Sequence, residues 1–311
     1  MNFSLFLDII LFAMFIMLIV AFVTYLERKI LALFQLRKGP NVCGWNGILQ
    51  PVADCIKLLN KQILFPSKAD KILFVIAPLI PIIFQMMTFC LLPIFNKTPL
   101  FESEYSLLII MVFSLISSFG ECLSGLTVDS VYQKLGSCRA IIQVFSYELC
   151  FCLCLLNIAL AYSSFDISVI ANNQEIWNVF KLPHIFIIYI CVTLAMCNRT
   201  PFDTLEAEQE LIAGYHTEYS SILFCLFYIS EYTNLCLVSF IGAILFLGGI
   251  NTIYNSYLIG SMMLLAKTFI ILISMIFIRA VLPRFRFYNI LRGFWFYLIP
   301  ILFISVIIYA L

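Results

Sequence analysis

Residues 3–25 read FSLFLDIILFAMFIMLIVAFVTY, a continuous apolar run in which Asp8 is the single charged residue. In a helix, about 20 apolar residues span the hydrocarbon core of a membrane. The run is too long for the core of a signal peptide, and it ends in Glu27-Arg28-Lys29 instead of a small-residue cleavage site. We therefore expect a membrane helix that is retained.

Similar runs recur along the whole chain. Of its 311 residues, 63% are hydrophobic and 11% are charged, whereas an ordinary soluble domain is roughly half apolar. The runs are continuous instead of alternating, which excludes a transmembrane β-barrel. The sequence predicts an all-α integral membrane protein with eight transmembrane helices, at residues 3–25, 72–95, 105–123, 140–163, 182–197, 219–247, 257–278 and 294–311.

The basic residues are distributed unevenly between the connecting segments. The segments after the first, third, fifth and seventh spans hold 15 of the 18 Lys and Arg residues. Because Lys and Arg are enriched in inward-facing loops, these segments are predicted to face the cytoplasm or the matrix. Both termini are then predicted to face outward.

Residues 1–311 are expected to form a single membrane domain, whose longest inward segment covers residues 26–70. Within this segment, Gln50, Asp54, Lys57 and Lys61 follow one another at spacings of four, three and four, with apolar residues between them. The pattern predicts an amphipathic helix at residues 48–61, lying at the membrane surface. Periodicity alone leaves two interpretations open: a surface anchor, or a gate beside a lateral opening for a lipid-like ligand.

Three ionisable residues lie deep inside predicted spans: Glu148, Glu231 and Lys267. Counted along a helix, Glu148 lies about 13 Å in from Arg139, and the other two lie about 18 Å in from the inward ends of their spans. A charge near the midplane costs several kcal/mol unless it is paired or hydrated. The three residues either form a structural Glu–Lys pair between helices or belong to a chain that handles protons or ions. Glu121, near the inner end of its span, can instead reach an interface.

An acidic inward segment at residues 198–218 begins NRTPFDTLEAEQE and lies between two apolar runs. Its first acids are Asp203, Glu206, Glu208 and Glu210. In a helix, Asp203, Glu206 and Glu210 share one face, whereas Glu208 points elsewhere. Carboxylates so close together can hold protons. The segment is either an ordinary solvated loop or a proton store that leads toward Glu231.

Motifs in six parts of the chain follow one another in an order that a known family shares. They are Glu27-Arg28-Lys29 with Gln35-Leu36-Arg37-Lys38-Gly39-Pro40-Asn41; Leu49-Gln50-Pro51-Val52-Ala53-Asp54; Gly136 to Arg139 with Ser146-Tyr147-Glu148; Asn198-Arg199-Thr200-Pro201-Phe202-Asp203; Glu231-Tyr232-Thr233-Asn234; and Ile278-Arg279-Ala280 with Pro283-Arg284-Phe285-Arg286-Phe287. On these motifs the sequence resembles, over nearly its whole length, the family of chain 1 of NADH:ubiquinone oxidoreductase, a membrane subunit of respiratory complex I.

The resemblance implies an eight-helix subunit that carries no redox centre, forms the entrance and wall of a ubiquinone tunnel, and starts a proton path. The implied tunnel residues are Arg28, Asp54, Lys57, Lys267 and Arg279. The implied proton path contains Asp203, Glu206, Glu208, Glu210, Tyr147, Glu148, Glu231 and Arg139. It also favours the gate interpretation of the amphipathic helix.

The same resemblance sets the expected cofactors and partners. Ubiquinone is the expected substrate, and this chain is expected to bind no cofactor or metal. FMN and iron–sulfur clusters are expected in partner subunits. The expected partners are hydrophilic subunits at the quinone site, adjacent small membrane subunits and lipids, and not nucleic acid.

The sequence departs from the family pattern at several positions. The family usually has Ala-Glu-Thr-Asn before the acidic segment, where this chain has Ala195-Met196-Cys197-Asn198. Glu121, which is not a family residue, is the candidate to replace the missing glutamate. Leu126, Val131 and Asn289 also depart from the family motifs.

Two other functions are compatible with a multi-span membrane chain: a membrane subunit of an ion-translocating hydrogenase, and a free-standing secondary transporter. A transporter would be expected to show internal repeats, and no convincing repeat occurs. The composition and the departures favour the mitochondrial inner membrane over a bacterial plasma membrane.

Overall fold

The computed structural model describes residues 3–67, 69–95, 99–204, 214–250 and 257–310, and all regular structure within these ranges is helical. The longer helices are α1 (Phe3–Phe34), α3 (Lys71–Cys90), α4 (Ser106–Leu126), α5 (Val131–Tyr162), α8 (Pro183–Met196), α10 (Ser221–Phe246), α11 (Tyr257–Val281) and α13 (Ile299–Ala310). The shorter ones are η1 (Trp45–Gly47), α2 (Gln50–Leu59), α6 (Ile167–Asn172), α7 (Asn178–Lys181), η2 (Gly214–His216), α12 (Phe287–Gly293) and η3 (Phe294–Leu298).

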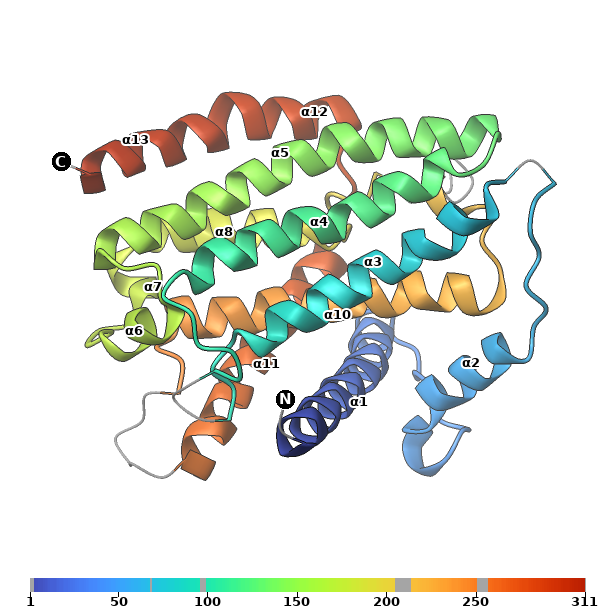
Figure 1. Ribbon diagram of the computed structural model, residues 1–311, viewed down its shortest axis with the longest axis horizontal. Helices are drawn as coiled ribbons and strands as arrows, with labels where there is room; N and C mark the ends of the chain where they lie inside the picture. Colours follow the sequence, from blue (N-terminus) through green and yellow to red (C-terminus); the bar gives the residue numbers. More distant parts are fainter. Residues whose placement is uncertain (1–2, 68, 96–98, 205–213, 251–256, 311) are drawn as a thin grey trace.

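The helices form one bundle, with α10 at its centre. Helices α3, α4, α5, α8 and α10 run side by side, whereas α1 and α11 cross them at an angle (Figure 1). Helix α10 contacts α1, α2, α3, α6, α7, α8 and α11, and most of its residues are buried. An apolar helix surrounded by other helices is a core element and not a lipid-facing one.

The predicted all-α membrane fold is confirmed. Seven helices of the described ranges are long and apolar enough to cross a membrane. The fifth predicted span is helix α8, whose 14 residues rise about 21 Å, less than the roughly 30 Å of a hydrocarbon core. Helix α8 begins at Pro183, one residue inside the predicted boundary, because Leu182, the residue before this proline, is not helical. The count of eight spans therefore stays a prediction.

Two helices continue well beyond their predicted apolar runs. Helix α1 runs on to Phe34 and α5 begins at Val131, nine residues outside each predicted boundary. Glu27 in α1 and Gln133 in α5 are almost fully buried by neighbouring parts of the chain. Polar residues end an apolar run, but they do not end a helix when protein covers them.

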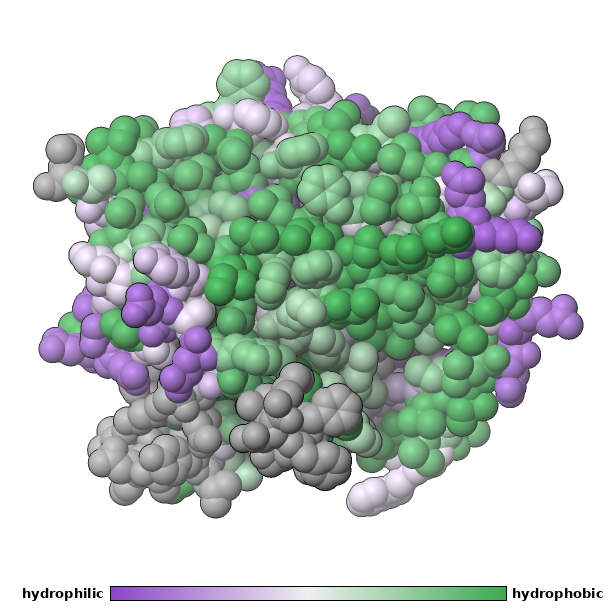
Figure 2. Space-filling model, viewed as in Figure 1, coloured by the Kyte–Doolittle hydropathy of each residue, from purple (hydrophilic) through white to green (hydrophobic). Residues whose placement is uncertain are grey.

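The surface has the polarity of a membrane protein. Hydrophobic residues cover the middle of the face in view, and hydrophilic residues gather toward its left and right ends (Figure 2). At the right lie α2, the starts of α3, α5 and α10 and the end of α4, while α6, α7 and the end of α13 lie at the left (Figure 1). The inward segments predicted after the first and third spans thus gather at one end of the bundle.

The α3–α4 contact offers a test of how tightly the bundle is packed. A Cβ added at Gly120 in α4 would lie 2.6 Å from Pro81 Cγ and 2.8 Å from the Ala77 carbonyl oxygen, both in α3. Gly120→Ala is therefore expected to destabilise the protein by about 1–3 kcal/mol, the usual cost of overpacking. A lower thermal midpoint of the purified protein in detergent would show this.

Gly293 provides the matched control for that substitution. A Cβ at this helical position meets no atom within 4 Å, so Gly293→Ala is expected to leave the midpoint unchanged or to raise it slightly. Equal midpoints for the two variants would mean that α3 and α4 separate without cost.

Candidate functional site

A cleft of about 580 Å³ lies between α1, α2 and α10. Its lining is mostly apolar, with charged residues contributed by α1 and α2. The lining residues are Met17, Val20, Ala21, Thr24, Arg28, Pro51, Asp54, Cys55, Lys57, Leu58, Phe224, Cys225, Tyr228, Ile229 and Tyr232. The size and composition are typical of a small-molecule site. Three of the predicted tunnel residues, Arg28, Asp54 and Lys57, are brought together here.

Helix α2 is held against α1 by polar contacts. Arg28 Nη1 lies 2.6 Å from Asp54 Oδ2, and Gln50 Nε2 donates to Asp54 Oδ1 at 3.1 Å. Tyr25 Oη also donates to the Asn46 carbonyl oxygen at 3.0 Å. The Arg28 side chain is half exposed, and an exposed ion pair contributes at most about 1 kcal/mol. These contacts therefore orient α2 beside the cleft more than they stabilise the fold.

A buried ionic group, here called the Glu27 node, consists of Glu27, Arg199 and Arg279. Glu27 Oε1 accepts a hydrogen bond from Arg199 Nη1 at 2.8 Å and another from Arg279 Nη1. The node joins α1, the segment that follows α8, and the last turn of α11. Arg279, a predicted tunnel residue, thus lies in this node and not in the wall of the cleft.

Tyr232 connects the node to the cleft. The Arg199 guanidinium carbon lies 4.6 Å from the centroid of the Tyr232 ring, and Tyr232 is itself part of the cleft lining. Burial by itself lowers the pKa of Arg199, but the Glu27 carboxylate, followed by Tyr232 and Glu231, raises that pKa above its ordinary value. A fixed positive charge therefore lies next to an aromatic wall of the cleft.

The start of the acidic segment is fastened to the α11–α12 connection. Asp203 Oδ2 lies 2.8 Å from Arg284 Nη2. The Pro201 carbonyl oxygen accepts from the Phe285 amide at 3.0 Å, and Thr200 Oγ1 donates to the Arg279 carbonyl oxygen at 3.0 Å. The other predicted acids of this segment, Glu206, Glu208 and Glu210, lie outside the described residues.

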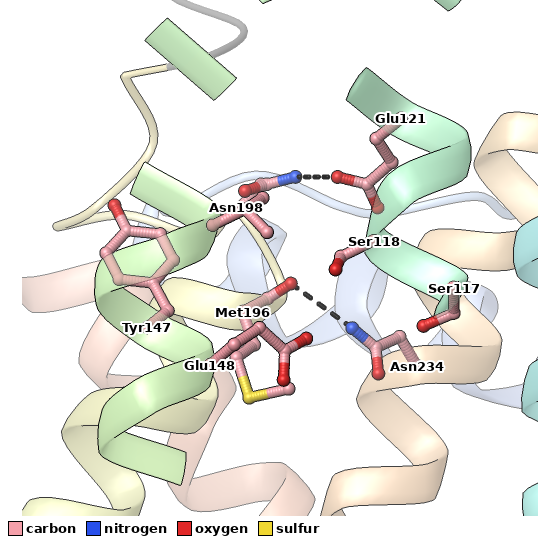
Figure 3. Close-up of a pocket in the computed structure, with 9 residues that line it drawn as sticks. Ser117, Ser118, Glu121, Tyr147, Glu148, Met196, Asn198 and Asn234 are labelled. Carbon is pink, nitrogen blue, oxygen red and sulfur yellow. Dashed lines mark hydrogen bonds between the residues drawn. The ribbon is translucent and has the colours of Figure 1, made fainter. Parts of the chain in front are cut away.

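A second, smaller space, here called the acidic cavity, has a volume of about 20 Å³. It is lined by Ser117, Ser118, Glu121, Val144, Tyr147, Glu148, Met196, Asn198 and Asn234 (Figure 3). Helices α4, α5, α8 and α10 and the residue Asn198 all contribute to it. A polar cavity of this size holds about one water molecule.

Hydrogen bonds organise the walls of this cavity. Asn198 Nδ2 donates to Glu121 Oε2 at 3.3 Å, and Asn234 Nδ2 donates to the Met196 carbonyl oxygen at 3.2 Å (Figure 3). Glu148 Oε2 accepts from Ser114 Oγ at 3.0 Å. Two carboxyl groups from different helices, α4 and α5, therefore face one small space.

The remaining predicted path residues lie around this cavity or farther along the same helices. Tyr147 packs against Phe294 with a centroid distance of 4.9 Å, and Arg139 stands two helical turns before it in α5, with its guanidinium carbon 5.8 Å from the centroid of the Phe287 ring. Glu231 Oε1 accepts from Tyr215 Oη at 3.2 Å.

Lys267 lies apart from both spaces. Its ammonium donates to the Gly249 carbonyl oxygen at 2.9 Å and stands 5.5 Å from the centroid of the Trp177 ring. Both partners belong to the end of the bundle that carries α6 and α7. Glu148, Glu231 and Lys267 were predicted to lie at a similar depth in the membrane. In the structure, each of them forms hydrogen bonds with different residues.

Several residues of the site were missed by sequence reasoning. In the sequence, Glu27 follows the first apolar run and begins a family motif, but no role was predicted for it. The polar face of α4, formed by Ser114, Ser117, Glu121 and Ser124, has spacings of three, four and three. That spacing is a helical stripe, and it could have indicated that Glu121 faces the interior instead of reaching an interface.

Comparison with known proteins gives one consistent result. A family model described as NADH dehydrogenase matches residues 7–310. The chain is 37% identical over 294 residues to NADH-ubiquinone oxidoreductase chain 1 of Mycosarcoma maydis, covering 92% of this chain and 89% of that protein. It is 36% identical over 300 residues to an NADH-quinone oxidoreductase subunit of Rickettsia typhi, covering 94% and 88% of the two chains. An NADH-quinone oxidoreductase subunit of Geobacter metallireducens is 35% identical over 316 residues, with 94% and 91% covered.

Proposed function

The chain belongs to the NADH dehydrogenase family, as a membrane subunit of an NADH–quinone oxidoreductase, and from this premise we propose that its cleft admits the quinone and its buried acids begin the proton path. The activity belongs to the whole enzyme. This chain supplies access, orientation and proton exchange, and the electron carriers, FMN and iron–sulfur clusters, reside in partner subunits.

The observation that carries the quinone half of the proposal is the cleft between α1, α2 and α10. A quinone has an apolar tail and a head with two carbonyl oxygens. Apolar side chains such as Val20 and Ile229 suit the tail, and Arg28, Tyr228 and Tyr232 offer donors to the head. Since α2 is amphipathic and lies at one side of the cleft, it acts as the gate through which a lipid-like ligand enters.

Arg279 and Lys267 support this cleft from outside it. Arg279 acts through the Glu27 node, which fixes Arg199 against Tyr232. Lys267 fixes the connection after α10 through Gly249, and so holds the far end of the helix whose first half lines the cleft.

The proton half of the proposal begins at the acidic segment. Asp203, with Glu206, Glu208 and Glu210 after it, would gain protons as quinone reduction places negative charge nearby. Glu148 and Glu231 lie further along, each buried and hydrogen-bonded to a hydroxyl group. Tyr147 and Arg139 lie on the helix that carries Glu148 and position it.

The proposed orientation in the membrane follows from the end of the bundle at which the basic segments lie. The loop at residues 26–70 and the acidic loop at residues 198–218 face the matrix of a mitochondrion, where hydrophilic partner subunits dock, and both termini face the intermembrane space. Small membrane subunits and lipids surround the remaining helices. The relatives include a fungal chain 1 and bacterial oxidoreductase subunits, and a bacterial plasma membrane is the alternative location.

Filling the cleft tests the quinone proposal. Ala21 lines it from α1, and Ala21→Trp adds bulk that a quinone must displace at a cost of about 1–3 kcal/mol. The KM for a long-tailed quinone is expected to rise about tenfold, since 1.4 kcal/mol is a factor of about 10. Steady-state kinetics of the assembled enzyme would measure this.

Leu18→Trp is the matched control, because Leu18 lies on the same helix, is 69% exposed and does not line the cleft. Its KM is expected to stay at the wild-type value. Oxidation of NADH by a hydrophilic artificial acceptor should be unchanged in both variants, which reports intact assembly. An unchanged KM in an assembled Ala21→Trp enzyme would contradict the assignment of the cleft.

A further inference from the structure

The acidic cavity places two buried carboxyl groups on opposite walls. Glu121 comes from α4 and Glu148 from α5, and Figure 3 shows both side chains directed toward the space that Ser118 and Asn234 also line. Each glutamate is more than nine-tenths buried, with exposures of 8% and 4%. A buried carboxyl group that faces a polar cavity is a candidate proton carrier.

The rest of the lining fits a bound water molecule. Ser117 and Ser118 use their hydroxyl hydrogens on backbone carbonyl oxygens, which leaves their oxygen lone pairs as acceptors toward the cavity. The carboxyl groups of Glu121 and Glu148 add further polar atoms to the same walls. A water needs two to four polar partners, and this cavity provides them in a volume of about 20 Å³.

Glu121 also connects the cavity to the acidic segment. Its carboxylate accepts from Asn198, the first residue of that segment. The side chain of Met196, two residues earlier, brings a thioether to the same wall, and a thioether cannot carry a proton at neutral pH. The carboxyl group nearest the acidic segment in this cavity therefore comes from α4 and not from α8.

We propose that Glu121 and Glu148 form a proton-relay pair that exchanges one proton through a water held in the acidic cavity. The carboxylic acid of one residue gives its proton to the water while the water gives a proton to the carboxylate of the other. The pair therefore keeps one proton and one negative charge, and the proton changes sides. This rests on the proposed function, since it names the residue that links the acidic segment to Glu148.

The first test removes the carboxylate from α4. Glu121→Gln keeps the shape and the contact with Asn198 but cannot carry a proton. In the assembled enzyme, proton translocation and quinone reductase turnover are expected to fall about 100-fold, the low end of what a proton-transfer group contributes. Glu102→Gln, at an exposed position before α4, is the control and is expected to match the wild type. Unchanged turnover and translocation in an assembled Glu121→Gln enzyme would overturn the proposal.

The second test moves the carboxylate across the cavity. In the double variant Glu121→Gln with Met196→Glu, a carboxyl group returns to the same space from α8, and turnover is expected to recover at least threefold over the single variant. Glu121→Gln with Met196→Gln, which returns no proton carrier, is expected to show no recovery. Loss in the single variant without recovery in the first double variant would also contradict the proposal, because a role for Glu121 outside the cavity would then explain the loss.

These outcomes separate the relay from the function on which it rests. A Glu148→Gln enzyme with unchanged quinone reduction and proton translocation would contradict the proton path itself. Impaired Glu148→Gln together with wild-type Glu121→Gln would contradict the relay alone. If Glu121→Gln does not assemble, both double variants are compared directly, and equal turnover in the two would overturn the relay.

Discussion

Glu27→Leu is expected to destabilise the chain by about 3–5 kcal/mol, the usual cost of removing one partner from a buried ion pair. Glu27 and the Arg199 side chain are 3% and 9% exposed. Without the carboxylate, the Arg199 guanidinium stays buried beside the Tyr232 ring with no counter-charge in the node. The chain should accumulate poorly in membranes, and the purified complex should show a lower thermal midpoint.

The control removes the arginines together with the glutamate. Glu27→Leu combined with Arg199→Met and Arg279→Met replaces the node by apolar side chains of similar size, which often restores stability. The triple variant is expected to regain most of the thermal midpoint while losing quinone reductase activity, because the fixed charge next to the cleft is gone. A Glu27→Leu protein as stable as the wild type would mean that water reaches the node.

Glu148→Gln is expected to lower quinone reductase turnover and proton translocation on the order of 100-fold, within the range for loss of a proton-transfer group. The introduced amide is isosteric with the carboxyl group and can still accept from Ser114 Oγ, so the helix contact at 3.0 Å is retained. What disappears is the exchangeable proton. Turnover with a short-chain quinone and quenching of a ΔpH-sensitive dye in proteoliposomes measure the two losses.

Ser114→Ala separates hydrogen bonding from protonation at the same position. This variant removes the donor to Glu148 but keeps the carboxyl group. We expect a loss of only about two- to tenfold, since an ordinary hydrogen bond contributes about 0.5–1.5 kcal/mol. Glu231→Gln, in which Tyr215 keeps an acceptor, is expected to resemble Glu148→Gln. Wild-type values in both glutamine variants would contradict the proton path.

The helices could be predicted from the apolar runs, but not their ends. The run at residues 140–163 identified α5, yet the helix begins at Val131, because Gln133 and Ser137 are covered by the neighbouring chain. A hydropathy pattern records the medium around a side chain and cannot tell lipid from protein. For the same reason the pattern did not indicate that Glu27 is buried inside the protein.

The site could be predicted only where its residues lie close in sequence or share a helical face. The spacing of Gln50, Asp54 and Lys57 indicated the polar face of α2, and the structure places Asp54 and Lys57 of that face in a cleft. The acidic cavity depends on how α4, α5, α8 and α10 pack together. Contacts such as Asn198 to Glu121, 77 residues apart, carry no local signal in the chain.

The central position of α10 has a consequence for biosynthesis. Of the seven long apolar helices in the described part of the chain, it has the lowest mean hydropathy and the largest buried share. It carries Glu231 and Thr233 near its middle. A nascent segment of this kind partitions poorly into lipid by itself. Its contacts with α1 and α3 involve helices already synthesised, whereas α11 emerges later. Insertion of α10 therefore depends on earlier helices that already form part of its binding groove. In a ribosome-arrested chain that ends after α10, this helix should already be protected from lipid.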